Sequence, residues 1–161
     1  MDTRLVGEVA AAMVSELESL RDAVHDIVEP LDDTAFWAKP IEPGNSVGNL
    51  VLHLTGNLNH FVGAQLGGTG YVRDREREFS ETNEPGKTEA LAGLDDAVAT
   101  FQRIVSSLGE QQLLAPHPEA RFGSVIKTLI HLVAHFALHR GQMSYLVRLA
   151  TTRQTGSPKH A

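Results

Sequence analysis

The chain has 161 residues, a formal net charge of −6 and no cysteine. A chain of this length suits one domain, and acidic and basic residues mixed along it argue against a nucleic-acid surface, which would show clustered Lys and Arg. The lack of cysteine excludes disulfides, thiolate ligands and a cysteine nucleophile, so any metal must be held by His, Asp or Glu.

The first predicted helix covers residues 5–28, where apolar residues recur every three or four positions with charged residues between them. It ends near Pro30. Residues 30–44 carry three prolines, a glycine and the only tryptophan, and we interpret them as an ordered connection rather than a helix. Trp37 is expected to cap the bundle or to line a pocket.

The second predicted helix begins after Asn45 or Ser46, either of which suits an N-cap, and closes at the glycine pair 67–68. Residues 69–87 are charged and show no sustained periodicity, so we expect a long loop there. Its arginines have two interpretations: they reach over a pocket and pair with a carboxylate, or they lie on a solvated surface. These arginines are Arg73, Arg75 and Arg77.

The third predicted helix follows Thr88 and ends at Gly109, and residues 110–123 form a connection broken by two prolines. The fourth and most hydrophobic helix runs from Ser124 to about Thr151. Residues 1–152 are therefore predicted to form a single domain, and residues 153–161 a disordered tail. We find no internal repeat and no credible strand.

Four long helical segments with apolar residues at the helical period predict an all-α fold, a four-helix bundle. The fourth helix is apolar nearly all round, so we expect the other helices and a second subunit to cover it, in a homodimer. The N-terminus lacks the pattern of a secretion signal, and no stretch approaches the roughly 20 apolar residues of a membrane span. These features predict a cytoplasmic protein without a membrane partner.

Three histidines, His131, His135 and His139, stand four residues apart in the fourth helix, within the stretch IHLVAHFALHRGQ. Imidazoles four apart on a helix can converge on one ion at about 2.0 to 2.1 Å from it. The outer two lie about 12 Å apart along the axis, so all three cannot share one ion. Spacing alone leaves both adjacent pairs open.

A third ligand must come from another helix, and the second helix offers His53 or His60. They are about 10.5 Å apart along the axis, so one ion would take one of them. His53 is favoured because it borders the apolar stripe of that helix, as does Asn57. The competing interpretation is that the histidines are hydrogen-bonded core residues or surface residues. We expect this of His25, His60, His117 and His131, and we expect no role for His160, which lies in the tail.

The stretches HLVAHFALHRGQM, NSVGNLVLHLTGNLNHF and GGTGYVRDREREF resemble the DinB-like superfamily of metal-binding four-helix bundles, over residues 37–149. Within that superfamily, the chain resembles a bacterial branch mostly of unknown function. The resemblance implies a three-histidine site for a divalent metal at His53, His135 and His139. It leaves His131 beside the site, as a residue of the pocket.

The better-understood relatives are thiol-dependent transferases and isomerases that use mycothiol, bacillithiol or glutathione. The resemblance therefore implies a metalloenzyme acting on a small molecule, either an S-transferase with a thiol cosubstrate or a hydrolase using metal-activated water. Zinc or nickel suits an all-imidazole site. Asn57 and Gln142 are candidates to orient a ligand or the metal-bound groups. The alternatives are a noncatalytic metal-binding or stress-response module, and a metal-free bundle.

Overall fold

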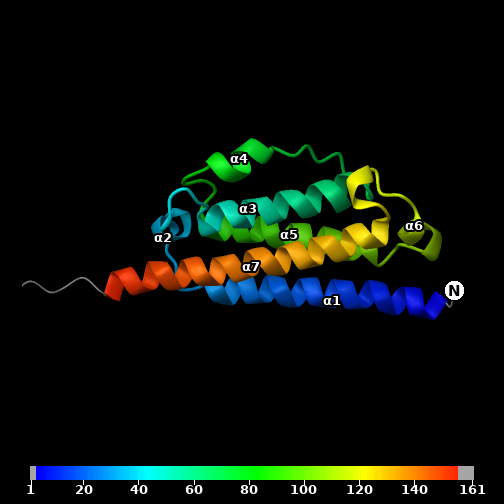
Figure 1. The fold of residues 1–161 in the computed structure, drawn as a ribbon, viewed down its shortest axis with the longest axis horizontal. Coiled ribbons are helices and arrows are strands. Elements are labelled where there is room, and N and C mark those ends of the chain that lie inside the picture. The colour runs from blue at the N-terminus through cyan, green and yellow to red at the C-terminus, as the bar shows by residue number, and fades with distance from the viewer. Residues whose placement is uncertain (1–2, 156–161) are drawn as a thin grey trace, which may run out of the picture.

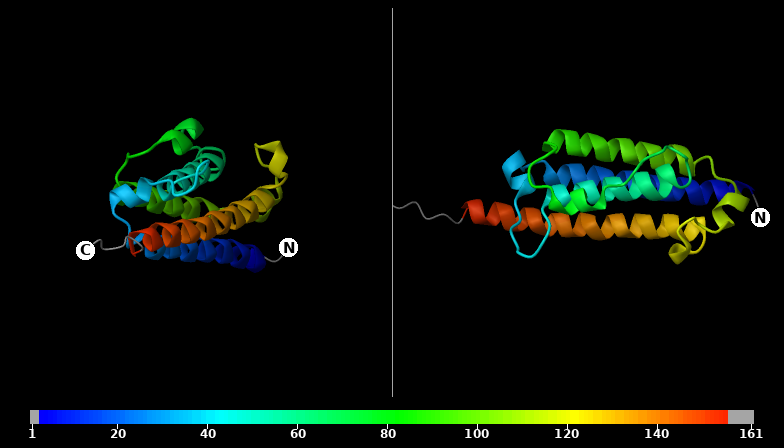
Figure 2. Two further views of the ribbon diagram at one scale, coloured as in Figure 1. Left: turned by 60° about the vertical axis from the view of Figure 1, so that its left-hand side comes forward. Right: turned by 90° about the horizontal axis from the view of Figure 1, so that it is seen from above.

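Four long helices run alongside one another in the computed structural model, which describes residues 3–155 (Figure 1). They are α1 (Thr3–Val28), α3 (Val47–Leu58) with its π-helical continuation η1 (Asn59–Ala64), α5 (Lys87–Val105) and α7 (Val125–Thr155). Each packs on two others: α1 and α3 both lie between α5 and α7, which gives a closed arrangement (Figure 2). The predicted four-helix bundle is confirmed.

The core forms where the apolar stripes of the four helices meet. Each long helix contributes side chains with almost no exposure, including Leu17 of α1, Leu54 of α3, Phe101 of α5 and Phe136 of α7. Burying one such side chain stabilises a fold by about 1.5 to 3 kcal/mol. The helical period of the apolar residues therefore accounts for the architecture.

Short helices occupy three segments that the sequence analysis assigned to connections. They are α2 (Asp33–Trp37), α4 (Arg75–Ser80), α6 (Glu110–Leu114) and the 3-10 turn η2 (Ala120–Phe122). The predictions of an entirely non-helical segment at 30–44 and a long loop at 69–87 are therefore wrong. These helices are too short to show a period, and side-chain caps begin two of them: Asp32 accepts from the backbone N–H of Ala35, and Asp74 from that of Arg77.

Helix α2 lies against the start of α3 at one end of the bundle (Figure 1), and the last residue of α2 is Trp37. Its ring rests on Gly48, where a Cβ atom would come within 2.6 Å of ring carbon Cε3. The indole Nε1–H donates a hydrogen bond of 3.1 Å to the Pro85 carbonyl. Trp37 thus joins the connection before α3 to the segment before α5, as a cap on the bundle.

Helix α7 is longer than predicted and less completely covered. It continues through Thr155, past the predicted end near Thr151, so the prediction of a disordered tail at 153–161 is wrong for residues 153–155. Residues 156–161, with His160 and the rest of that predicted tail, lie outside the described residues. Ile130, Leu138 and Tyr145 are each more than half exposed. The chain's own helices therefore leave one apolar face of α7 open.

The described residues contain neither a strand nor a membrane-spanning helix. They form no strand, and the only extended pairing among them is an isolated bridge between Pro116 and Ser124. No helix between residues 3 and 155 combines the length and apolar character that crossing a membrane requires.

Candidate metal centre

His53 of α3 and His135 and His139 of α7 face one another between the two packed helices. One nitrogen from each ring lies within 4.8 Å of the others, the spacing of a group that could hold a metal ion. The Nε2 atoms of His135 and His139 are 3.0 Å apart, and the His53 ring centroid is about 5 Å from both of theirs. The turn of α7 that carries His135 and His139 faces His53. His135 therefore pairs with His139 and not with His131.

Each of these three imidazoles has a polar partner at its Nδ1 atom. Glu78 Oε2 lies 2.9 Å from His53 Nδ1, and Gln142 Oε1 lies 2.7 Å from His139 Nδ1. The Asn57 amide lies 3.4 Å from His135 Nδ1, and rotation of an amide exchanges its oxygen and nitrogen. An imidazole that binds metal through Nε2 carries its proton on Nδ1, where it needs such an acceptor.

The three imidazoles and their hydrogen-bond partners therefore suit a divalent transition metal. One nitrogen from each of the three rings converges, and the neighbouring side chains can accept from an Nδ1–H. No carboxylate joins the group among the described residues, so three protein ligands would leave coordination positions for a water or a substrate.

Burial keeps two of these imidazoles neutral. Desolvation, followed by the like charges of His139 and His53, lowers the pKa of His135 to about 4. Desolvation also lowers the pKa of His139, although its hydrogen bond to Gln142 acts in the opposite direction. Near pH 7 both rings therefore have a lone pair available for a metal, which a protonated imidazole lacks.

Glu78 orients His53 from a buried ion pair with Arg73. The guanidinium Nε and Nη2 atoms lie 2.6 and 2.7 Å from the two carboxylate oxygens. Burial by itself would raise the Glu78 pKa, but the hydrogen bonds from Arg73 and His53 outweigh it, so the pKa lies below its usual value. The carboxylate is thus charged near neutral pH and can accept from both neighbours.

Gly56 makes room for this ion pair on α3. A Cβ atom at position 56 would lie 2.1 Å from Glu78 Oε1, closer than any stable contact. The absence of a side chain one turn beyond the centre of α3 therefore lets α4 bring its carboxylate against His53.

His131 lies outside the cluster, on the turn of α7 that precedes His135. Its ring stacks on that of His135, with centroids 5.9 Å apart, and it also contacts Phe122 at 5.1 Å. The side chain is exposed at the edge of a cavity of about 310 Å³ that reaches His53 and His135. His131 is thus a pocket residue.

The histidines predicted to be structural or surface residues have protein partners. His25 Nε2 lies 2.8 Å from Asp95 Oδ1, and His60 Nε2 lies 3.1 Å from the Gln65 amide. His117 is buried, with Nε2 3.1 Å from the Phe61 carbonyl. His25, His60 and His117 are not members of the three-histidine group.

Of the three arginines in the 69–87 segment, two reach a pocket and one lies on the solvated surface. Arg73 and Arg75 line the 310 Å³ cavity, whereas Arg77 is exposed and pairs with Glu81 at 3.7 Å. Arg121, from the distant turn η2, joins the same cavity. Neither Arg121 nor Glu78 could be identified from the sequence, because both reach the site through folding of segments without periodicity.

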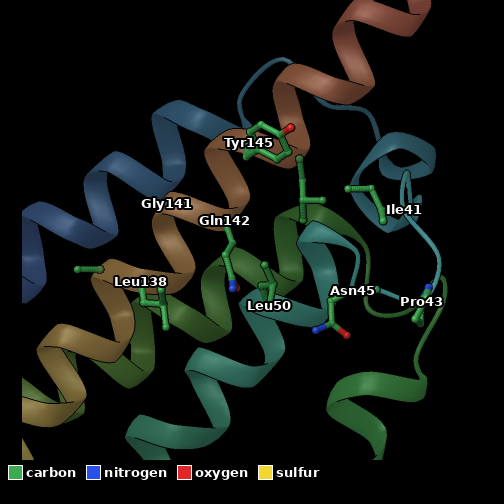
Figure 3. Close-up of a pocket in the computed structure, with 11 residues that line it drawn as sticks. Ile41, Pro43, Asn45, Leu50, Leu138, Gly141, Gln142 and Tyr145 are labelled. Carbon is green, nitrogen blue, oxygen red and sulfur yellow. The ribbon is translucent and has the colours of Figure 1, made fainter.

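A larger apolar groove of about 670 Å³ lies on the other side of Gln142. Figure 3 shows the Gln142 side chain reaching from α7 toward Leu50 of α3, with Leu138 and Tyr145 beside it on α7. Because Gln142 also contacts His139, one residue links the groove to the histidine cluster.

Comparisons with known proteins agree with this architecture. The family model described as Mycothiol-S-transferase matches residues 12–151. A solved structure, described as the conserved protein of locus from Enterococcus faecalis, is similar with a TM-score of 0.69 and 16% identity, over 94% of this chain and 98% of that one. At this identity the likeness shows the fold alone. No curated protein matches the chain.

Proposed function

Because the chain belongs to the mycothiol S-transferase family, a DinB-like family, we propose that it is a divalent-metal enzyme that joins the sulfur of a small thiol to an electrophilic substrate. His53, His135 and His139 would hold the metal, with zinc or nickel the foremost candidates. A cytoplasmic location and a small-molecule substrate belong to the same proposal.

The observation that carries the proposal is the convergence of three imidazoles, each with a polar partner at Nδ1. A divalent ion held there would lower the pKa of a bound thiol, so that the sulfur is nucleophilic near pH 7. The chain has no cysteine, so the thiol must come from a cosubstrate.

The surrounding residues have separate tasks in such a reaction. Glu78, Asn57 and Gln142 hold the three rings in the orientation that binds metal. In the transfer, the sulfur bonds to the acceptor carbon, the acceptor's leaving group departs with the electron pair, and the thiol proton is released. The lack of a fourth protein ligand within the described group supports this over a closed structural ion, which usually has four ligands.

Metal content tests the site directly. Protein purified without a nickel column should contain about one divalent ion per chain, and His53→Ala and His135→Ala should remove it while the bundle still folds. His60→Ala, on the continuation of the same helix, is the matched control and should keep the ion. Retention of the metal by His53→Ala would contradict the assignment.

Thiol conjugation tests the activity. The metal-loaded protein, supplied with mycothiol or glutathione and monochlorobimane, should form the fluorescent thioether and release chloride at least about tenfold faster than the metal-free protein. A metal-loaded protein that accelerates conjugation with none of these thiols would favour the noncatalytic module instead.

We further propose that a second copy of the chain covers the open face of α7, forming the homodimer expected from the sequence. This face combines three large side chains, each more than half exposed, with three small residues that permit close approach of a helix. The residues are Ile130, Ala134, Ala137, Leu138, Gly141 and Tyr145. They fall within an arc of about 100° at the helical repeat, which suits pairing of one helix with its own copy across a two-fold axis.

Sedimentation velocity tests the dimer. Leu138→Glu should convert a dimer to a monomer, because it would place a charge in an apolar interface. Leu5→Glu, at a similarly exposed apolar residue of α1, should not. A wild-type chain that sediments as a monomer at tens of micromolar would contradict this proposal.

A further inference from the structure

The cavity beside the three-histidine cluster has a basic and aromatic lining. Its volume of about 310 Å³ is at the small end of ligand cavities, which span about 300 to 1,000 Å³. His53 and His135 form part of its wall, so a molecule inside it reaches the proposed metal position. The remaining lining includes Arg73, Arg75, Arg121, Phe61, Phe122 and His131.

Two of the three arginine charges in this lining are weakly compensated. Arg73 is neutralised by the buried Glu78 carboxylate. Arg75 has no carboxylate within ion-pair distance among the described residues, and Arg121 has only Glu119, at 3.5 Å, with the Arg121 side chain 66% exposed. An exposed pair of this kind contributes little, so both guanidiniums remain available to an anion.

Aromatic rings support these two guanidiniums from one face. The Arg75 guanidinium carbon lies 5.1 Å from the Phe79 ring centre, and that of Arg121 lies 4.6 Å from the Phe122 ring centre. Stacking leaves the N–H donors along the guanidinium edge free for two parallel hydrogen bonds to a carboxylate. Arg75 follows α3 in the chain and Arg121 precedes α7, so the two reach the cavity from different segments.

From this arrangement we propose that the cavity binds the carboxylate of a small substrate at Arg75 and Arg121, with the apolar part of that substrate against Phe61 and Phe122. The proposal rests on the proposed transferase function, because the carboxylate belongs to one of its two substrates. That substrate is either the thiol or the acceptor. In both cases its reacting end points to His53 and His135.

Binding of benzoate and of its neutral analogue benzamide, measured by calorimetry on the metal-free full chain, tests the anion site without the metal. Benzoate should bind at least about tenfold more tightly than benzamide, and Arg75→Gln and Arg121→Gln should each weaken benzoate binding by about fivefold or more. Arg121→Lys should recover part of the loss. Arg103→Gln, on an exposed face of α5 outside the cavity, should leave binding unchanged.

Two results would overturn the proposal. One is equal affinity for benzoate and benzamide, and the other is an Arg103→Gln variant that loses as much benzoate affinity as Arg75→Gln. If benzoate selectivity persists in a protein that never takes up metal, the carboxylate site stands and the transferase function fails. If the protein binds zinc and thiol but does not prefer carboxylates, the transferase function stands and this inference fails.

The cobalt-loaded protein distinguishes the two sources of the carboxylate, because a thiolate bound to cobalt has its own absorption band. N-acetylcysteine binding more tightly than N-acetylcysteinamide, with the preference lost in Arg75→Gln, would assign the carboxylate to the thiol. N-acetylcysteinamide binding together with benzoate would assign it to the acceptor. Either result supports the carboxylate site. A third result would overturn it: benzoate competes with N-acetylcysteinamide, and neither Arg75→Gln nor Arg121→Gln changes that competition. Benzoate would then bind the metal and not the arginines.

Discussion

Replacing Glu78 by Gln perturbs the residue on which both the ion pair and the orientation of His53 depend. Glu78 is 4% exposed and accepts hydrogen bonds from Arg73 and from His53 Nδ1. Gln has the same size, but its amide nitrogen is a donor that faces other donors. The substitution therefore leaves the Arg73 guanidinium without its counter-ion in a nearly buried position.

The expected loss follows from the contacts. Removing one partner of a buried ion pair costs about 3 to 5 kcal/mol. The Arg73 side chain is 11% exposed, so water can solvate part of the unpaired guanidinium charge and reduce this cost. We expect a loss of about 3 kcal/mol in the free energy of unfolding, or about 6 to 12 °C in Tm at this chain length. Loss of the partner that orients His53 should also weaken metal binding by about 10- to 100-fold.

Two assays separate these effects. Urea unfolding of the metal-free chain, followed by circular dichroism, gives the stability loss, and calorimetric titration with zinc gives the change in affinity. Glu76→Gln, on the exposed face of the same short helix, is the matched control and should change stability by less than about 0.5 kcal/mol. The double variant Arg73→Gln with Glu78→Gln should lose less than the sum of the single losses, because neither charge is left unpaired.

Two results would contradict a buried, coupled Arg73–Glu78 ion pair. One is a Glu78→Gln variant as stable as Glu76→Gln, which would mean that water already solvates the ion pair. The other is strict additivity in the double variant, which would mean that Arg73 and Glu78 act independently.

Three further predictions concern Gly56, acid and metal removal. Gly56→Ala should destabilise the chain by about 1 to 3 kcal/mol because its Cβ would meet Glu78 Oε1 at 2.1 Å, whereas Gly7→Ala, with nothing within 4 Å, should be neutral or stabilising; thermal unfolding of both checks this. The His135 pKa of about 4 lies below its unfolded value of 6.5, so the unfolded metal-free chain protonates first and stability falls as the pH drops from 6.5 to 4. After allowance for solvent screening the loss is about 1 to 2 kcal/mol, and His135→Gln should flatten the curve in urea titrations above pH 4.5. Finally, free zinc at about 100 times Kd should raise stability by about 2.7 kcal/mol, and a chelator should reverse the gain in Tm; no response to chelation would contradict the metal site.

The local features of this protein could be predicted from its sequence. Apolar residues at helical spacing predicted the four long helices, and four-residue spacing placed His135 and His139 on one face of α7. Both inferences depend on helical geometry within one segment, which involves no distant part of the chain. The choice of His53 over His60 also followed from one segment, because His53 borders the apolar stripe that α3 buries.

The surroundings of the histidines depended on packing between segments distant in the chain. Glu78 contacts His53 across 25 positions, and Arg121 joins Arg73 and Arg75 only after η2 folds beside α7. The short helix α4 is anchored by the Arg73–Glu78 ion pair, which has no sequence period, so the segment was expected to be a loop. Likewise, hydrophobicity predicted that α7 would be covered, but only the tertiary structure showed which face the chain leaves open. Helical spacing along the chain thus accounts for the long helices and for the His135–His139 pair. The hydrogen-bond partners of the histidines and the charge of the cavity arise instead from packing, because those contacts join residues that share no local geometry.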